Sequence, residues 1–514
     1  MNYADLFRAT LPETALEAAA LFVLFVDLGF LRKAAAGLRV TVAALLGVAG
    51  CIAALWAVSV AGPYSYGSDQ LLAAGGSAGV AQCALLILTI LTLLLLVGAE
   101  FTRNPGEYVS VVLMAAAGGL IISAAQDLLV IFIGLELLSL GLYVLTAFAK
   151  RSGKSAEAAM KYYLFGGMSA AFLLFGFSYL YGLTGSTNLH EIAFAAAVGR
   201  ANGAVPLLYV ALVMIAAGLG FKVAAVPFHL WAPDTYEGAP APAAAFVASV
   251  SKVASFALLI GIGTAFVHIL DNVHGGLVFV RFGFPTRYFG LLGPWELILT
   301  VLAVASMVFG NLAALAQSSV RRLLAYSAIA HAGYILLGLA FFSWTNLSAQ
   351  AILYYIATYG LTTIGAFGVV GVVERATGSD RLDAFLGLHK RNPLLAAVML
   401  VLFLSLAGIP PLVGFWAKFN LFAAVLRASA TVGVGGGALP FTLVALAVAF
   451  SAVSLYYYLQ VLKRAYVMPG IDESPIKAHP VTLATLLAIA AAVLVLGCFP
   501  ALLQGWIASF YPAM

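Results

Sequence analysis

Long apolar runs, each followed by a short polar loop, fill almost the whole chain. A helix needs about 20 mainly apolar residues to cross a bilayer. Fourteen runs of this kind lie near 11–31, 40–60, 79–99, 108–125, 127–148, 160–184, 205–228, 241–270, 294–316, 322–342, 348–373, 394–428, 439–462 and 481–505. The pattern predicts an all-α polytopic membrane protein with about 14 transmembrane helices, forming a single membrane domain over 1–514.

Two of these runs are interrupted. The run at 205–228 breaks at Pro227, and the run at 394–428 contains GIPPLVG at 408–414 and is too long for one straight span. Proline has no backbone N–H, and backbone groups that it frees inside a bilayer need partners in protein or in a water-lined cavity. We therefore predict discontinuous seventh and twelfth helices, a feature typical of ion or proton passage.

The distribution of basic residues predicts the orientation. Of the 25 lysines and arginines, 17 lie in loops after odd-numbered spans, five on the opposite side and three within spans. Basic residues in short loops stay on the cytoplasmic side, so both termini are expected to face away from the cytoplasm. The amino terminus lacks the layout of a cleaved signal peptide, so we expect the first run to be retained as a span.

Composition narrows the class of protein. Hydrophobic residues make up 63% of the chain and charged residues 9%, whereas soluble domains carry about 25% charged residues. The three cysteines, Cys51, Cys83 and Cys498, are isolated, and iron–sulfur or zinc sites need clustered ligands. We expect no redox centre and no metal in this chain, and the net charge of +5 without a basic patch gives no indication of nucleic acid binding.

Four ionisable residues lie inside predicted spans, namely Glu136, Lys222, Lys252 and Lys418. A charge at the centre of a membrane helix costs roughly 2.5 to 3.5 kcal/mol, so the four together cost about 10 to 14 kcal/mol. That sum is comparable to the whole stability of a domain, about 5 to 15 kcal/mol. The cost indicates a functional role. Such groups can hold and release protons as neighbouring charges move, although the residue types also suit transport of another cation.

A faint internal repeat brings in His331, about ten residues into the run at 322–342. Glu136 and Lys222 are 86 positions apart, and His331 and Lys418 are 87 apart. Inverted repeats with discontinuous helices are common in transporters. The interval makes His331 a candidate relay member, with a packing role as the alternative.

For the other polar residues near the spans, we predict structural or solvated roles and no part in proton transfer. His229, beside Pro227, is predicted to satisfy backbone groups freed at the break. Asp234 and Glu237 are expected to be solvated or structural, and Asp127 to begin a span at the outer surface.

Several motifs carry a family resemblance over roughly residues 105–465. They are GLELLSLGLYVL at 134–145, KYYLFGGMSAAFLLFGFSYLYGLTG at 161–185, GLGFKVAAVPFHLWAPDTYEGAP at 218–240, VRRLLAYSAIAHAGYILLGL at 320–339 and LSLAGIPPLVGFWAKF at 404–419. With these motifs the chain resembles the antiporter-like membrane subunits of respiratory complex I, the proton-pumping NADH:quinone oxidoreductase. It is most similar to the subunit N group, because it lacks the long lateral helix of subunit L and has Lys418 where subunit M has a glutamate.

The resemblance implies two inverted five-helix repeats, formed by spans four to eight and nine to thirteen. The expected organisation is three N-terminal helices (1–105), a first repeat (106–270), a second repeat (293–465) and a C-terminal helix (466–514). It also implies a proton relay in which Glu136 and Lys222 form a charged pair. Lys252 would be the central lysine and Lys418 a terminal site opening to the outer face.

The resemblance also implies the setting of the chain. NAD, FMN, iron–sulfur clusters and quinone would be held by partner subunits and none by this chain, which would meet quinone only indirectly. The expected partners are other complex I membrane subunits, including subunits M and K, together with the lipid bilayer and protons. The expected location is the bacterial inner membrane, with both termini periplasmic. Alternatives are a subunit of a multi-subunit cation/proton antiporter, and a scaffold that only holds other subunits.

Overall fold

The computed structural model describes residues 7–61, 71–99, 101–197, 205–274, 294–342, 346–431, 438–470 and 474–511. The α-helices in these residues are α2 (Leu11–Gly29), α3 (Ala36–Ala61), α4 (Gly76–Leu96), α5 (Pro105–Ala124), α6 (Leu128–Thr146), α7 (Gly153–Thr184), α8 (Leu189–Ala197), α9 (Val205–Val223), α10 (Trp231–Gly238), α11 (Ala241–Phe246), α12 (Lys252–His274), α13 (Pro294–Leu315), α14 (Val320–Ala340), α15 (Asn346–Thr377), α16 (Leu388–Arg391), α17 (Pro393–Ala407), α18 (Val413–Thr431), α19 (Ala438–Tyr466), α20 (Pro480–Cys498) and α21 (Pro500–Ser509).

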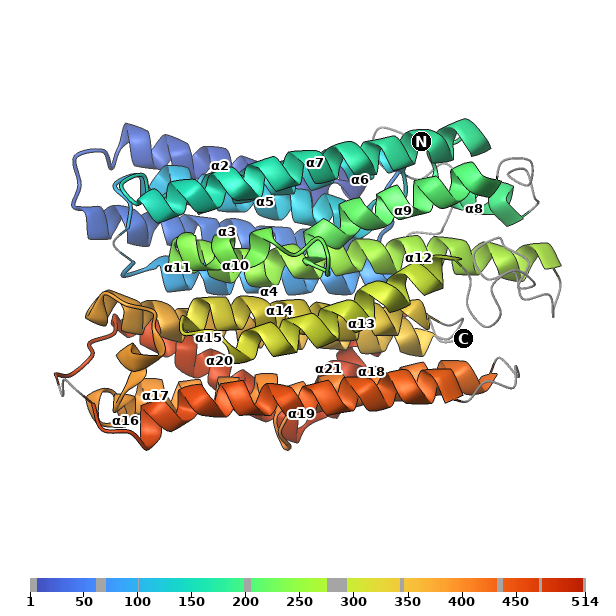
Figure 1. Ribbon diagram of the computed structural model, residues 1–514. Helices are drawn as coiled ribbons and strands as arrows, with labels where there is room; N and C mark the ends of the chain where they lie inside the picture. Colours follow the sequence, from blue (N-terminus) through green and yellow to red (C-terminus); the bar gives the residue numbers. More distant parts are fainter. Residues whose placement is uncertain are drawn as a thin grey trace.

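The long helices run side by side along one common direction (Figure 1). Within the described residues, twelve helices are long and apolar enough to cross a membrane. The two remaining predicted spans correspond to α2 and to the pair α17 and α18. The predicted all-α polytopic fold with about 14 spans is therefore confirmed.

The seventh span is broken as predicted. Helix α9 ends at Val223, and α10 begins only at Trp231. Side chains bond backbone groups at this break, since the Val226 N–H donates to Ser306 Oγ (2.9 Å) and Trp231 Nε1 donates to the carbonyl of Phe221, in the last turn of α9 (2.9 Å).

His229 lies at this break in the role predicted for it, because its imidazole has a hydrogen bond with the Pro227 backbone. Its ring also packs against Phe309 with 4.8 Å between ring centroids, and its Nδ1 atom is buried without a hydrogen-bond partner among the described residues. Ser306 and Trp231 are the side chains that bond the backbone groups at Val226 and Phe221.

The twelfth span is broken by the predicted proline segment. Helix α17 ends at Ala407, and Gly408 caps it in the left-handed conformation at φ +87°. That conformation is open to glycine at little cost. Helix α18 then begins at Val413, so the long apolar run becomes two half-helices.

The eighth span has an irregularity that the hydrophobic pattern did not predict. Between α11 and α12, residues Val247–Ser251 form a π-helical turn, and Lys252 follows it directly. Such turns are rare and occur often at functional sites. The turn lies immediately before a buried lysine.

The second half of the bundle repeats the order of the first. Helices α5 to α12 comprise five spans with a broken fourth member, and α13 to α19 do the same. Because each set contains an odd number of spans, the two sets have opposite orientations in the membrane. The lysines are not at equivalent positions, however. Lys222 lies before its break, in the last turn of α9, whereas Lys418 lies after its break, in α18.

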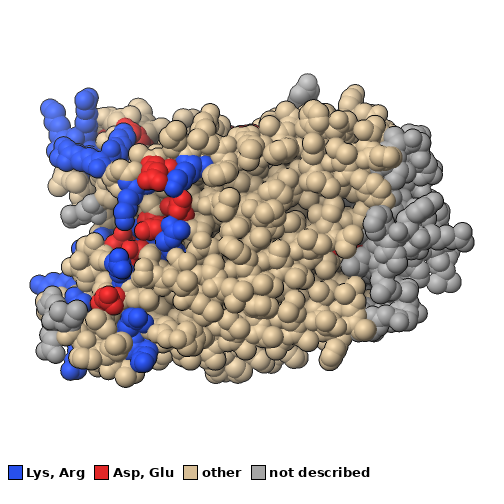
Figure 2. Space-filling view, viewed as in Figure 1, with Lys and Arg blue, Asp and Glu red and all other residues tan. Residues whose placement is uncertain are grey.

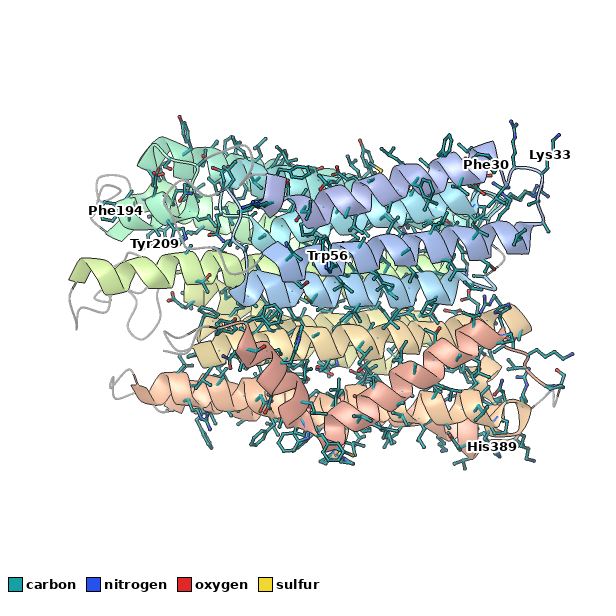
Figure 3. The ribbon with its side chains drawn as sticks, turned by 180° about the vertical axis from the view of Figure 1, so that it is seen from behind. Phe30, Lys33, Trp56, Phe194, Tyr209 and His389 are labelled. Carbon is teal, nitrogen blue, oxygen red and sulfur yellow. The ribbon has the colours of Figure 1, made fainter. Side chains whose placement is uncertain are left out.

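Charged side chains gather at one end of the bundle (Figure 2). This agrees with the asymmetry of lysine and arginine in the sequence, although Arg200, Arg281 and Arg287 of the opposite side lie outside the described residues. Seen from behind, Lys33 and His389 lie at one end and Phe194 and Tyr209 at the other (Figure 3). Large apolar side chains such as Trp56 are exposed along the flanks, as expected for a surface that faces lipid.

Candidate functional site

The four basic candidates are all buried inside the bundle. The exposed fraction is 5% for Lys222, 3% for Lys252, 6% for Lys418 and 4% for His331. Glu136 is partly buried on α6. An ionic group in such surroundings needs hydrogen-bond partners, and the partners differ from residue to residue.

Lys222 is held by the helix that carries Glu136. Its ammonium group donates a hydrogen bond to Ser139 Oγ, and Ser139 in turn donates to the Leu135 carbonyl of the same helix. Glu136 lies one turn from Ser139 on α6. No ion pair within 4 Å joins Glu136 to Lys222 in the described structure. The implied charged pair therefore stays a prediction, with Ser139 as the observed contact.

Lys418 is held by the end of the other half-helix. Its Nζ donates to the carbonyls of Leu406 (3.1 Å) and Ala407 (3.0 Å) and to Ser451 Oγ (2.9 Å). The last carbonyls of a helix have no intrahelical partner and carry partial negative charge. The carboxyl end of α17 thus supplies two of the three acceptors for this lysine, and none of the three is a carboxylate.

Gly408 makes this arrangement possible. A Cβ atom at this position would lie 3.0 Å from Lys418 Cδ and 3.1 Å from Lys418 Nζ. The residue at 408 must therefore combine a left-handed backbone with the absence of a side chain, and only glycine does both at low cost.

Lys252 connects the two halves. Its Nζ donates to the Ala328 carbonyl of α14 at 2.5 Å. Ala328 precedes His331 by one helical turn, so the lysine of the first repeat binds the helix that carries the histidine of the second.

His331 lies at the centre of a tyrosine cluster. Its Nδ1 is 2.8 Å from the Tyr355 hydroxyl and its Nε2 is 3.5 Å from the Tyr458 hydroxyl. The imidazole ring also contacts Tyr359, with 4.8 Å between ring centroids, and Tyr334 at 5.8 Å. Both imidazole nitrogens therefore have hydroxyl partners, as a relay group requires.

The cluster extends further through hydroxyl and amide groups. Ser327 and Tyr458 share a short hydrogen bond, Tyr457 donates to Asn311 Oδ1 (3.1 Å), and Asn311 Nδ2 donates to Tyr334 (3.1 Å). Lys418 Nζ lies 5.6 Å from the Tyr334 ring centroid. Buried polar groups thus occur in a row from Lys252 past His331 to Lys418.

The tyrosine cluster was missed by reasoning from sequence. Tyr334, Tyr355, Tyr359, Tyr457 and Tyr458 all lie in apolar runs, where aromatic residues are ordinary packing residues. The available signal was that a buried tyrosine hydroxyl usually has a hydrogen-bond partner, so five of them on three spans indicate a shared polar interior.

The predicted residues fall into two groups. Lys252, His331 and Lys418 meet around the tyrosine cluster. Glu136 and Lys222 form a second group at Ser139, and no hydrogen bond in the described part of the chain joins that group to Lys252. Three basic groups in one buried region cannot all be charged at low cost, so a proton gained by one disfavours a proton on the next. This arrangement can pass protons along a row.

A separate ion network connects the two repeats at the charged end. Asp234 of α10 binds Lys161 of α7 (2.8 Å) and Arg322 of α14 (2.7 Å), and Arg322 also binds Glu237 (3.0 Å). Partial burial alone would raise the pKa of the Asp234 carboxyl. The hydrogen bonds and charges of Lys161 and Arg322 outweigh it and lower this pKa from its ordinary 3.8. The prediction of a structural role for Asp234 and Glu237 agrees with these contacts.

Asp127 also has a structural role. It is the N-cap of α6, where Oδ1 accepts from the Leu129 N–H (2.8 Å) and Oδ2 accepts from the Thr187 hydroxyl (2.5 Å). In the described residues, no group of three or more His, Cys, Asp or Glu side chains is placed to hold a metal ion.

Comparison with known proteins agrees with this geometry. Residues 125–274 and 262–442 match the family described as NADH:quinone oxidoreductase/Mrp antiporter, transmembrane. A curated relative, NADH-quinone oxidoreductase subunit N 2 of Acidobacterium capsulatum, is 46% identical over 99% of both chains. Another, subunit N 1 of Roseiflexus castenholzii, is 41% identical over 84% of this chain and 78% of the relative.

Solved structures show the same fold. A chain of respiratory complex I from Thermus thermophilus matches with a TM-score of 0.74 and 33% identity, covering 96% of this chain and 98% of that one. A chain of the Mrp complex from Dietzia matches with a TM-score of 0.76 and 22% identity, covering 98% and 97%. At that lower identity the second likeness concerns the fold alone.

Proposed function

The chain belongs to the subunit N family of NADH-quinone oxidoreductases, and on this premise we propose that it translocates protons through Glu136, Lys222, Lys252, His331 and Lys418. It is an antiporter-like, multi-pass membrane subunit of the enzyme complex. The observation that carries the proposal is the buried row of polar groups at Lys252, His331 with its tyrosine hydroxyls, and Lys418.

The proposed mechanism uses Lys252 as the central group. Its contact with the Ala328 carbonyl links the first repeat to the helix of His331. Quinone reduction in other subunits would perturb this polar row and shift the populations of its protonation states. Protons would then pass from the group at Glu136 and Lys222 to Lys418, whose half-helix would open to the outer face.

The partners and the location are part of the same proposal. NAD, FMN, iron–sulfur clusters and quinone belong to partner subunits in this scheme, and this chain holds no redox centre. The neighbours would include subunits M and K. An even number of spans puts both termini on one side, and the charged end faces the cytoplasm by the positive-inside rule. Both termini would thus be periplasmic in a bacterial inner membrane.

The central test is Lys222→Ala in the assembled complex. We expect NADH-driven proton pumping in membrane vesicles and NADH:quinone reductase activity to fall together, by about tenfold, because alanine cannot carry the proton that the Lys222 amine holds and releases. The control is Lys33→Ala, a change at an exposed loop lysine. Pumping and quinone reduction that both survive Lys222→Ala would refute the proposal.

Purification distinguishes two hypotheses, namely that the chain is part of the redox complex and that it is part of a cation/proton antiporter assembly. The chain is tagged and isolated in mild detergent, and the flavin and iron–sulfur absorbance is recorded as NADH is added. Bleaching by NADH in a stoichiometric assembly is the expected result. A colourless complex of small membrane subunits with sodium-dependent proton exchange would assign the same residues to a cation/proton antiporter.

A further inference from the structure

A cavity opens at the charged end of the bundle, between the two repeats. It has a volume of about 390 Å³, and its walls come from the α10 to α11 connection, the start of α14 and the end of α15. Glu237, Arg321 and Glu374 line it together with apolar residues such as Ala245 and Phe367. At about 30 Å³ per water molecule, it has room for on the order of ten waters.

Arg321 marks the polar wall of this cavity. The side chain is 4% exposed, pairs with Glu374 at 3.2 Å and donates a hydrogen bond to the Ala239 carbonyl. Its Nε atom is buried and has no hydrogen-bond partner within the described part of the chain. Buried polar atoms are bonded in the great majority of cases, to protein or to ordered water, so this N–H indicates water in the cavity.

Two further buried hydroxyls lie inward from the cavity. They are Tyr236 Oη, on a residue 0% exposed and without a hydrogen-bond partner among the described residues, and Thr363 Oγ1, on a residue 3% exposed. The Tyr236 ring packs against Phe367 with 5.7 Å between centroids, and Phe367 is part of the cavity wall. Thr363 lies one turn before Phe367 on α15.

The same helix face continues to the histidine. Tyr359 lies one turn before Thr363, and its phenol lies beside the Thr363 hydroxyl. The Tyr359 ring is 4.8 Å from the ring of His331 by centroids. Hydroxyl groups therefore occur at each turn from the cavity wall to the tyrosine cluster.

We propose that this cavity is a cytoplasmic proton entrance that leads through Tyr236, Thr363 and Tyr359 to His331 without passing Lys222. Water in the cavity supplies the proton, and the hydroxyls pass it inward by donating one proton as they accept another. The inference rests on the proposed function, since an entrance needs a relay to serve. It adds a second access point, between the repeats, that the lysines of the broken helices do not provide.

The test is Thr363→Val in the complete complex. Valine keeps the shape of threonine and removes the hydroxyl. The matched control is Thr362→Val, because Thr362 is equally buried but its hydroxyl donates to the Thr358 carbonyl of its own helix (2.8 Å). We expect Thr363→Val to lower NADH-driven pumping in inside-out vesicles by about three- to tenfold, and Thr362→Val to stay near the parent. Tyr236→Phe is the second variant, and native gels check assembly.

The outcomes distinguish failure of the proposed entrance from failure of the proposed proton-relay function. If Thr363→Val and Tyr236→Phe pump like the parent while Lys252→Ala does not, the entrance is refuted and the proton-relay function stands. If Lys252→Ala also pumps like the parent, the proposed function itself fails.

Access of water is measured independently of pumping. Ala241 lines the cavity, so Ala241→Cys, with the three native cysteines replaced by serine, should react with a membrane-impermeant thiol reagent in inside-out vesicles. Absence of labelling in an assembled complex would overturn the entrance.

Discussion

Lys222 and Lys418 lie at the two broken helices, but the protein holds them differently. Lys222 is in the last turn of its own half-helix and binds Ser139 on a neighbouring helix, one turn from Glu136. Lys418 follows its break and binds the terminal carbonyls of the preceding half-helix. The first site has a carboxylate nearby and the second uses backbone dipoles. Both satisfy a buried ammonium group, but only the first has a titratable carboxylate close by, whereas the backbone acceptors of the second keep a constant charge when a proton moves.

The largest effect is expected from Lys418→Ala. The change removes the proton carrier and leaves the Leu406 and Ala407 carbonyls without this donor. Pumping should fall by more than about tenfold, and quinone reduction should fall with it. Vesicle acidification and NADH oxidation in matched preparations measure the two. Parent-level pumping would show that the second broken helix is only structural.

A moderate effect is expected from Gly408→Ala. A left-handed alanine costs roughly 1 to 2 kcal/mol, and the new Cβ would lie 3.0 Å from Lys418 Cδ. The matched control is Gly185→Ala, which has φ +77° and no heavy atom within 4 Å of the new Cβ. Both variants should lower the thermal unfolding temperature, but Gly408→Ala should also lower pumping. Equal behaviour of the two would mean that the fit around Lys418 is not needed.

The smallest effect is expected from Asp234→Asn. Each of its partly exposed ion pairs is worth roughly 0.2 to 1 kcal/mol, so unfolding by denaturant should shift only slightly, and less at high salt. The pKa of Asp234 is lowered in the folded protein, so its contribution is present above pH 3.8 and is lost as the pH falls through the folded pKa. The difference between parent and variant should be constant from pH 5 to pH 8. A difference that changes in that range would contradict this assignment.

The fold and part of the site could be predicted from local sequence. Length and hydropathy determine membrane spans because the bilayer sets a single distance for every helix. Pro227 and the GIPPLVG segment determine the breaks because a proline lacks an N–H wherever it lies. Lys222, Lys252 and Lys418 could be identified as candidates because a charged residue inside a membrane span is energetically costly. These inferences need no knowledge of which helices are neighbours.

Only the tertiary structure decided how those residues are connected. The intervals from Glu136 to Lys222 and from His331 to Lys418 are nearly equal, at 86 and 87 residues. Even so, Lys222 lies before the break in its span and Lys418 lies after the break in its own. Tyr355 and Tyr458 are ordinary aromatic residues in the sequence, and they become partners of His331 only when α15 and α19 pack beside α14. A hydrogen-bond network depends on distances between separate helices, and those distances follow from packing of the whole bundle, which no single stretch of sequence contains.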